Sequence, residues 1–317
     1  MAHKDVLTKD YMQLKDVFAD VFNFFLFDGN PVIQPQQLQE KSTEIFEIRK
    51  LPYGKNQTVQ QFRDLLCLLS MNDEDHSYLL LGIENQTQVH YAMPVRSMLY
   101  DALQYRDQIK QITKQRRLEK QKAIGSAEFL SGFQKDDHLQ PVITLVVYFG
   151  TDPWDGPRSI HEMFCDLPPD LLTHIPDYKL HLVEPAALSD EDLQKFQSNL
   201  REVLTCIKYA NDKERLSAVI QEPRFQAVQY EAAALLNEFA DLKIDLTDKQ
   251  KGGAINMFIG FEQIKEDCKR EGSLEALITS VKSLMTNLNM DAEAAMKALS
   301  IPEDQQEKIL KQINSAS

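Results

Sequence analysis

Two apolar segments of strand length, separated by a polar turn, form the clearest pattern in the chain. Residues 62–70 (FRDLLCLLS) and 78–86 (YLLLGIENQ) lie on either side of the turn NDEDHS, which predicts a β-hairpin with a longer loop. The second segment ends in Glu84-Asn85-Gln86, where polar residues replace apolar ones. Because side chains alternate between the two faces of a strand, Glu84 and Gln86 share one face and Asn85 points to the other.

The predicted hairpin brings two acidic residues together. With its midpoint in the polar turn, Asp64 on the first strand lies close to Glu84 or Gln86 on the second. Two carboxylates that face each other across a strand pair repel, and a divalent cation between them would relieve the repulsion. Without a bound cation, the substitution Glu84→Gln is therefore expected to raise the melting temperature. The alternative is that both acids are merely solvated strand ends.

Further periodicities predict an α/β fold. A helix expected to begin near Pro94 carries an apolar stripe that would face the core. Residues 141–150 (PVITLVVYFG) are apolar nearly throughout, which is typical of a central strand buried on both faces. Strands that alternate with helices indicate an α/β sandwich with a mixed sheet flanked by helices. The other predicted elements are an apolar helix over Tyr11–Phe27, short strands over Ile45–Lys50 and Tyr178–Pro185, and an amphipathic helix over Asp190–Tyr209; the stripe consists of Val95, Met98, Leu99, Ala102, Ile109 and Ile112.

Beyond about residue 213 the pattern is helical only, which divides the chain into two parts. Residues 1–225 contain the α/β pattern, and residues 226–317 are predicted to form a helical C-terminal region. Helices are expected over Tyr230–Ala240 and Asn256–Lys269, followed by shorter ones, of which one has Asp291 as its N-cap. The last helix lacks a basic face, so this region is expected to bind protein or to form a homo-oligomer rather than to read DNA.

The net charge of −13 argues against a protein that coats nucleic acid, because phosphate binding normally requires a basic surface. The charge is uneven, however, and residues 106–122 contain seven basic side chains and two acidic ones. Within this stripe, Lys114, Arg116 and Arg117 are candidates for contacts with a DNA backbone. The alternative is a solvated helix face, which is common for such runs.

Cysteine usage and hydropathy favour a soluble, cytoplasmic protein. The four cysteines are far apart and include no C-x-x-C pair, which is typical of reduced thiols and disfavours a zinc site. No apolar run is long enough to span a membrane, and the first residues carry no signal-peptide pattern. We therefore expect no membrane association.

Asp64, followed by Glu84-Asn85-Gln86 at the end of an apolar strand, resembles the acid–spacer–acid-x-Lys motif of the PD-(D/E)xK nuclease superfamily, with Gln86 where lysine is usual. The resemblance is closer to one branch, the Rpn family of bacterial recombination-promoting nucleases, which are also described as transposases. From about Phe18 to Lys208 the chain is similar to this family in a series of phrases. They are GIENQ, HYAMPVRSMLYDA, EFLSGF, PVITLVVYFG, WDGPRSIHEMF and PDYKLHLVEP.

This resemblance implies a restriction-endonuclease-like core and a bacterial, cytoplasmic DNA endonuclease that depends on Mg²⁺ or Mn²⁺ and is linked to recombination or mobile elements. It implies that Asp64, Glu84 and Gln86 are catalytic. It also implies that Asp64, Glu84 and the backbone carbonyl of Asn85 hold the metal ion, which would activate a water molecule. Because the usual lysine is replaced, an inactive nuclease fold that binds DNA or protein is the alternative function.

Three further residues are implied near the same site. Asp20 resembles the acid of an early helix that approaches the metal in this family; a capped or ion-paired structural aspartate is the alternative. Arg96 and Tyr100 share one face of the helix that follows the second strand, and they are expected to contact a phosphate or to pack against the sheet.

Trp154 and Arg158, in a turn-rich segment after a strand end, are expected to form a binding loop.

Overall fold

The computed structural model of the chain describes residues 3–50, 56–62, 64–72, 77–119, 126–240, 246, 253–258, 262, 276–286, 290–302, 306 and 309–310. By their contacts, the residues divide into two compact units. One comprises Met1–Asp241 with Leu246–Ile255, and the other comprises Leu242–Asp245 with Asn256–Ser317. The candidate site lies wholly in the first unit.

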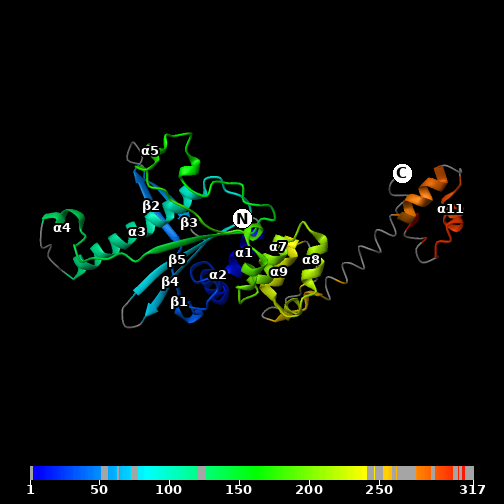
Figure 1. Cartoon of the computed structure of the whole chain (residues 1–317), viewed down its shortest axis with the longest axis horizontal. Helices are drawn as coiled ribbons and strands as arrows, with labels where there is room; N and C mark the ends of the chain where they lie inside the picture. The colour runs from blue at the N-terminus through cyan, green and yellow to red at the C-terminus, as the bar shows by residue number, and fades with distance from the viewer. Residues whose placement is uncertain are drawn as a thin grey trace. The chain divides into compact units, whose positions relative to one another are not determined.

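A five-stranded mixed sheet forms the centre of the first unit, and this confirms the predicted α/β class (Figure 1). The first three strands of the sheet pair antiparallel and the last three pair parallel, so the middle strand belongs to both sets. The strand order is β1 (Leu38–Glu40), β4 (Leu65–Asn72), β5 (Ser77–Gln86), β6 (Val142–Tyr148) and β7 (His181–Val183).

The β4–β5 hairpin has the register that brings the two acids together. Leu65 pairs with Ile83 and Leu66 with Gly82, and the pairing continues to Ser70 opposite Tyr78 before a shift near the turn. Extending this register by one residue places Asp64 opposite Glu84. The tight pairing follows from the apolar residues of both strands, since a slip by one residue would turn each of these side chains to the other face.

Helix α3 (Met93–Leu118) connects β5 to β6 and packs against β6. It begins where it was predicted to begin, with Pro94 in the first turn, but the predicted core stripe is wrong. Val95, Met98 and Leu99 are each at least 40% exposed, whereas the side turned to the sheet is largely polar. That buried side consists of Met93, Pro94, Ser97, Tyr100, Asp101, Leu103 and Gln104.

Polar partners on the sheet explain this orientation of α3. Asp101 accepts hydrogen bonds from the Thr144 hydroxyl of β6 at 2.5 Å and from the Tyr178 hydroxyl at 2.6 Å. Arg96 reaches a carboxylate on β5. Buried polar groups of this kind must be satisfied, so a helix face with matching partners is held at the sheet even though an apolar face is available.

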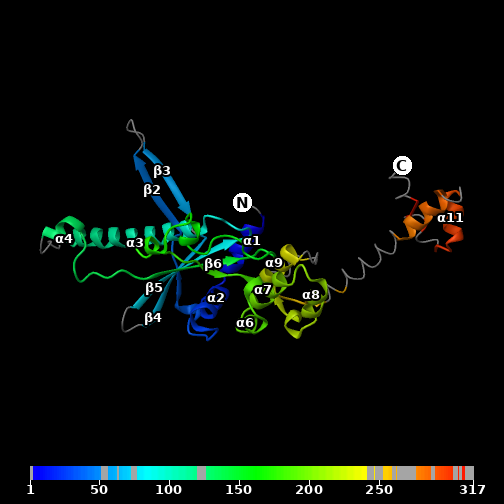
Figure 2. The same cartoon turned by 45° about the horizontal axis from the view of Figure 1, so that its top comes forward.

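The N-terminal segment forms two helices rather than the single one predicted over Tyr11–Phe27. Helix α1 (His3–Met12) ends before Lys15, where α2 (Lys15–Phe27) begins. As expected for an apolar helix, α2 buries Val17, Phe18, Val21 and Phe22. In both views of the cartoon α2 lies on the side of the central sheet away from α3 (Figures 1 and 2).

The predicted helix over Asp190–Tyr209 is also interrupted. The structure has α6 (Asp190–Gln194) and α7 (Leu200–Lys208), with a non-helical link between them. The Asp20 carboxylate explains the link, because it accepts hydrogen bonds from the backbone N–H groups of Gln197 and Ser198. A buried carboxylate on α2 is thus satisfied by amides that a continuous helix would use for itself.

The other elements of the first unit are short. The predicted strand over Ile45–Lys50 is confirmed, and it pairs with a second strand to form a separate two-stranded ribbon of β2 (Glu44–Lys50) and β3 (Asn56–Phe62) (Figure 2). Helix α9 (Tyr230–Ala240), also predicted, packs against α1 and α7. The rest are η1 (Pro35–Gln37), α4 (Ser126–Ser131), η2 (His161–Met163), α5 (Pro169–Leu172), η3 (Pro185–Ala187), α8 (Lys213–Ile220), η4 (Pro223–Gln226), β8 (Val228–Gln229) and β9 (Ala254–Ile255).

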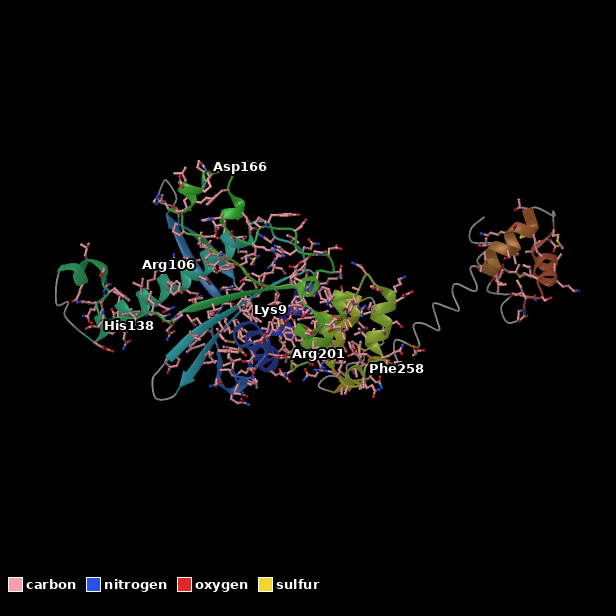
Figure 3. The ribbon with its side chains drawn as sticks, in the orientation of Figure 1. Lys9, Arg106, His138, Asp166, Arg201 and Phe258 are labelled. Carbon is pink, nitrogen blue, oxygen red and sulfur yellow. The ribbon has the colours of Figure 1, made fainter. Side chains whose placement is uncertain are left out.

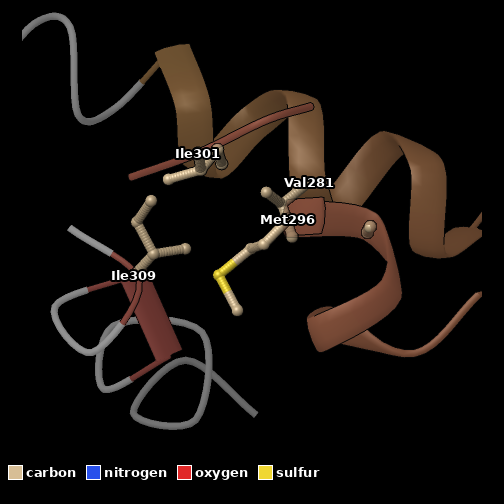
Figure 4. Close-up of a cluster of buried hydrophobic side chains, with 5 residues drawn as sticks. Val281, Met296, Ile301 and Ile309 are labelled. Carbon is tan, nitrogen blue, oxygen red and sulfur yellow. The ribbon is translucent and has the colours of Figure 1, made fainter. Parts of the chain in front are cut away.

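The second unit has a small apolar core of its own. Val281, Ala295, Met296, Ile301 and Ile309 are buried against one another (Figure 4). Helix α11 (Ala292–Ala298) is capped as predicted, since the Asp291 side chain accepts a hydrogen bond from the N–H of Ala294. Most of the helix predicted over Asn256–Lys269, with Cys268, lies outside the described residues.

Two expectations from the composition can be compared with the described residues. The cysteines among them, Cys67, Cys165 and Cys206, are free thiols. In the part of the chain that the structure describes, no helix combines the length and the apolar character needed to cross a membrane.

Candidate functional site

The ends of β4 and β5 place the two acids side by side. Asp64 directly precedes β4, and its Oδ2 accepts a hydrogen bond from the backbone N–H of Asn85 at 2.8 Å. Glu84, one residue earlier on β5, is fully buried. The Asn85 carbonyl leaves the strand on the same side as its N–H, toward Asp64, because both groups of one residue face the same neighbouring strand.

Arg96 supplies a positive charge to this acidic pair. Its Nη2 lies 3.0 Å from Oε2 of Glu84, and its Nε donates a hydrogen bond to the Tyr100 hydroxyl at 3.2 Å. The guanidinium also lies over the Tyr100 ring, 5.5 Å from its centroid. The first turns of α3 therefore bring Arg96 and Tyr100 to Glu84, and part of the repulsion between the acids is relieved by the protein itself.

The electrostatic balance of the site is set by burial and by two cations. Burial raises the pKa of the Asp64 carboxyl, while the N–H of Asn85 and the charges of Arg96 and Lys9 act in the opposite direction. Burial alone would lower the pKa of Arg96, but Glu84 and the Tyr100 hydroxyl raise it overall. Arg96 accordingly stays charged. Burial, and then Glu84, raises the pKa of Tyr100, which stays neutral.

A polar cavity of about 390 Å³ opens beside the two acids. Its lining includes Asp64 directly before β4, Asn85 and Gln86 from the end of β5, and Arg96 from α3, so three elements converge there. Glu84 does not line it and lies behind it, in contact with Arg96. The structure therefore brings together five of the residues singled out in the sequence, namely Asp64, Glu84, Gln86, Arg96 and Tyr100.

Sequence reasoning missed the two charged residues that α1 contributes to this cavity, Asp5 and Lys9. They lie four residues apart and thus on the same face of the helix. Asp5 Oδ1 accepts a hydrogen bond from the Thr87 hydroxyl, directly after β5, at 3.0 Å. The only signal in the sequence was their four-residue spacing, which is too common to connect a helix with a strand nearly eighty residues later.

The donor set suits a hard divalent cation that keeps part of its water shell. Mg²⁺ is usually bound by one or two carboxylates together with waters and substrate phosphate oxygens, and Asp64, Glu84 and the Asn85 carbonyl provide that number of oxygen ligands. Among the described residues, no group of three or more His, Cys, Asp or Glu side chains could hold an ion. The site thus offers two carboxylates and one carbonyl, of which Asp64 and Asn85 line the cavity and Glu84 would have to be shared with Arg96.

Asp20 does not join this cluster. Its carboxylate accepts hydrogen bonds from the N–H groups of Gln197 and Ser198 and from the Ser198 hydroxyl, at distances of 2.6–3.1 Å. These four bonds agree with the alternative that Asp20 is a structural aspartate. They tie α2 to the segment before α7.

The basic stripe extends away from the site along α3. Arg116 follows Arg96 by twenty residues, which corresponds to about 30 Å of helix. Figure 3 shows Lys9 beside the central sheet and Arg106 farther out along α3. Arg116 forms an ion pair with Asp137, while Lys114 and Arg117 are exposed. Lys114 and Arg117 would therefore contact only a ligand long enough to extend along α3 away from the acids.

Trp154 and Arg158 fold back onto the protein. Trp154 is buried against Tyr148, and its backbone N–H donates to Glu184 Oε1 at 2.7 Å. Arg158 pairs with the other oxygen of Glu184 at 2.6 Å. Both residues thus hold the loop after β6 in place around a buried carboxylate.

Comparison with known proteins gives one match. A family model with the description "Putative transposase, YhgA-like" matches residues 36–233, which is more than half of the chain. No curated protein and no solved structure matches. The matched segment contains Asp64, Glu84, Gln86 and Arg96, whereas α1 with Lys9 precedes it.

Proposed function

We propose that this chain, which belongs to the YhgA-like family, is a metal-dependent DNA endonuclease. The observation that carries the proposal is the convergence of Asp64, Glu84 and Arg96 at one end of a β-hairpin, beside a polar cavity. The family supports a role connected with mobile elements or DNA recombination. The strand order, with an antiparallel hairpin, a crossover helix and a parallel strand, supports a restriction-endonuclease-like core.

In the proposed reaction, a water oxygen forms a bond to the phosphorus of a DNA phosphodiester while the bond from phosphorus to one sugar oxygen breaks. The attacking water loses a proton to solvent, and the leaving oxygen takes one up. Asp64, Glu84 and the Asn85 carbonyl would hold Mg²⁺ or Mn²⁺, which lowers the pKa of bound water and stabilises negative charge on the phosphate. Gln86 would orient the attacking water through its amide, because an amide both donates and accepts hydrogen bonds.

The second candidate function is a nuclease fold that binds DNA without cleaving it. The contact between Glu84 and Arg96 is the observation that favours it, because a carboxylate already neutralised by a guanidinium is a weaker ligand for a metal ion. The basic stripe on α3 would serve either function, since phosphate contacts position DNA without chemistry.

Cleavage of supercoiled plasmid in Mg²⁺ or Mn²⁺ separates the two functions. The parent should nick or linearise the plasmid, EDTA should stop the reaction, and Asp64→Asn should reduce it to background while remaining folded. Millimolar Mn²⁺ should also raise the melting temperature of the parent but not of Asp64→Asn, since a ligand that binds only the folded state stabilises it. If the parent binds DNA but does not cleave it, the nuclease is refuted and the binding function remains. Full cleavage by Asp64→Asn would refute the assignment of the site.

A further inference from the structure

We propose that Lys9 of α1 provides the positive charge that glutamine at position 86 does not, and that its ammonium contacts the phosphate of the DNA in the cavity beside Asp64. The proposal deepens the proposed nuclease function and rests on it. The ligand chemistry is a phosphodiester with a single negative charge.

The cavity itself places Lys9 and Gln86 together. Both residues line the same space of about 390 Å³, Gln86 from the end of β5 and Lys9 from the first helix. Lys9 also borders a second, smaller cavity of about 180 Å³ on the β4 side of Asp64. A long, flexible ammonium side chain at this position can reach a group bound next to Asp64 from either cavity.

Helix α1 is anchored firmly enough to hold Lys9 in position. Asp5, on the same face, accepts the hydrogen bond from Thr87 and so ties α1 to the segment after β5. Helix α1 also buries Thr8, Tyr11 and Met12 completely, and it packs against α2 and α9. The backbone at Lys9 is therefore held both by this packing and by the bond to Thr87, as a residue that positions a substrate requires.

The two cations of the cavity differ in how strongly neighbouring groups hold them. Arg96 is held by Glu84 and by the Tyr100 hydroxyl. Among the described residues, no carboxylate forms an ion pair with the Lys9 ammonium, although the charge of Lys9 acts on Asp64. Lys9 is thus the cation that can turn to an incoming phosphate without breaking an ion pair of the described structure.

Charge counting around the cavity shows why a second cation matters. Asp5, Asp64 and Glu84 carry three negative charges against two positive charges on Arg96 and Lys9, and a divalent ion in the proposed site would turn this excess of one negative charge into one positive charge. A singly charged phosphate would then be balanced only with Lys9 included, because the neutral amide of Gln86 adds no charge. A preorganised ammonium aimed at the place where charge develops is the kind of group that enzymes use for this purpose.

Relocating the charge tests the proposal directly. Single-turnover cleavage of one plasmid in Mn²⁺ would be compared for the parent, Lys9→Met, Gln86→Lys and the double variant Lys9→Met/Gln86→Lys. Lys9→Met should slow cleavage by roughly a hundred- to a thousand-fold, as expected for one donor to the transition state. The double variant should recover at least ten-fold of that loss, because it returns an ammonium to the same cavity. Lys213→Met, at an exposed position on α8, is the control with the same change in net charge.

Binding of a short DNA duplex in EDTA gives a second readout that does not need cleavage. Each phosphate contact adds about 0.9 to the slope of log Kd against log salt concentration. Lys9→Met should lower this slope by about that amount, the double variant should restore it, and Lys213→Met should leave it unchanged. Melting temperatures of all variants verify that each is folded.

The outcomes separate this proposal from the function on which it rests. A parent that binds DNA but does not cleave it refutes the nuclease, while the salt slope still decides whether Lys9 contacts phosphate. If the parent cleaves and Lys9→Met cleaves equally fast with an unchanged slope, the role of Lys9 is refuted and the nuclease stands. A slow Lys9→Met that the double variant does not improve would show that Lys9 acts through local structure, which also overturns the proposal.

Discussion

Replacing Glu84 by glutamine should destabilise the metal-free protein, which reverses the expectation drawn from the sequence. Repulsion between Asp64 and Glu84 had suggested that the substitution would stabilise the fold. In the structure, however, Glu84 is fully buried and pairs with Arg96 at 3.0 Å. Glu84→Gln keeps the shape of the side chain and removes the charge, so the Arg96 guanidinium loses its main partner.

The magnitude follows from the burial of the two partners. Removing one member of a fully buried ion pair costs about 3–5 kcal/mol. The Arg96 side chain is 31% exposed and retains the Tyr100 hydroxyl, so water and that hydroxyl recover part of the loss. We therefore expect a loss of roughly 2–3 kcal/mol in the free energy of unfolding, below the range for complete burial. For a unit of this size that corresponds to a fall of about 4–12 °C in melting temperature.

Thermal unfolding in EDTA of the parent, Glu84→Gln, Arg96→Met and the double variant measures this effect. The double-mutant cycle isolates the coupling between the two side chains from their other contacts. Glu214→Gln, at an exposed position on α8, is the matched control and should change stability by less than about 0.5 kcal/mol. A melting temperature of Glu84→Gln at or above that of the parent would refute the reasoning, because repulsion from Asp64 would then outweigh the pair with Arg96.

Three further predictions concern other parts of the chain. Gln86→Ala should lose roughly a hundred- to a thousand-fold in single-turnover cleavage, and Gln86→Lys should retain measurable cleavage; a parent-like rate for Gln86→Ala would remove this residue from the site. Hydrogen bonds from Lys195, and then from Ser189, lower the pKa of Asp192 to about 2, so its contribution to stability is present above pH 4 and is lost as the pH falls toward 2. Asp192→Asn should accordingly melt below the parent at pH 7, and melting curves should converge toward pH 2; a constant difference would contradict this. A chain that ends after residue 258 should keep the melting temperature of the first unit, whereas one that ends after residue 225 should melt far lower or aggregate, because it lacks the buried leucines of α9.

Local patterns predicted the parts of the site that lie close together in sequence. The apolar segments of β4 and β5 and the turn between them were enough to pair Asp64 with the end of β5, and Pro94 marked the start of α3. These features depend on the nearest residues, where periodicity and turn chemistry are informative. The fold class followed from the same patterns.

Three of the errors came from contacts between distant segments. The exposed Val95, Met98 and Leu99 were assigned to the core because an apolar stripe normally faces inward, and the sequence could not show that Asp101 has hydroxyl partners on β6 and in the segment before β7. The break between α6 and α7 depends on a carboxylate more than 170 residues earlier. Lys9 was missed for the same reason, since nothing near it in sequence relates it to β5.

The hydrogen bonds between Asp20 and Ser198 also determine when this protein can fold during its own synthesis. The two residues are 178 positions apart, so the clamp cannot close until most of the α/β unit has been translated. At usual rates of synthesis that interval lasts roughly ten to forty seconds. Throughout it Phe24 of α2 lacks Phe196, against which its ring stacks in the folded unit, and Asp20 lacks its amides. The nascent N-terminal helices are therefore expected to depend on chaperones, and stalling of translation before residue 198 should yield chains that aggregate rather than a partly folded unit.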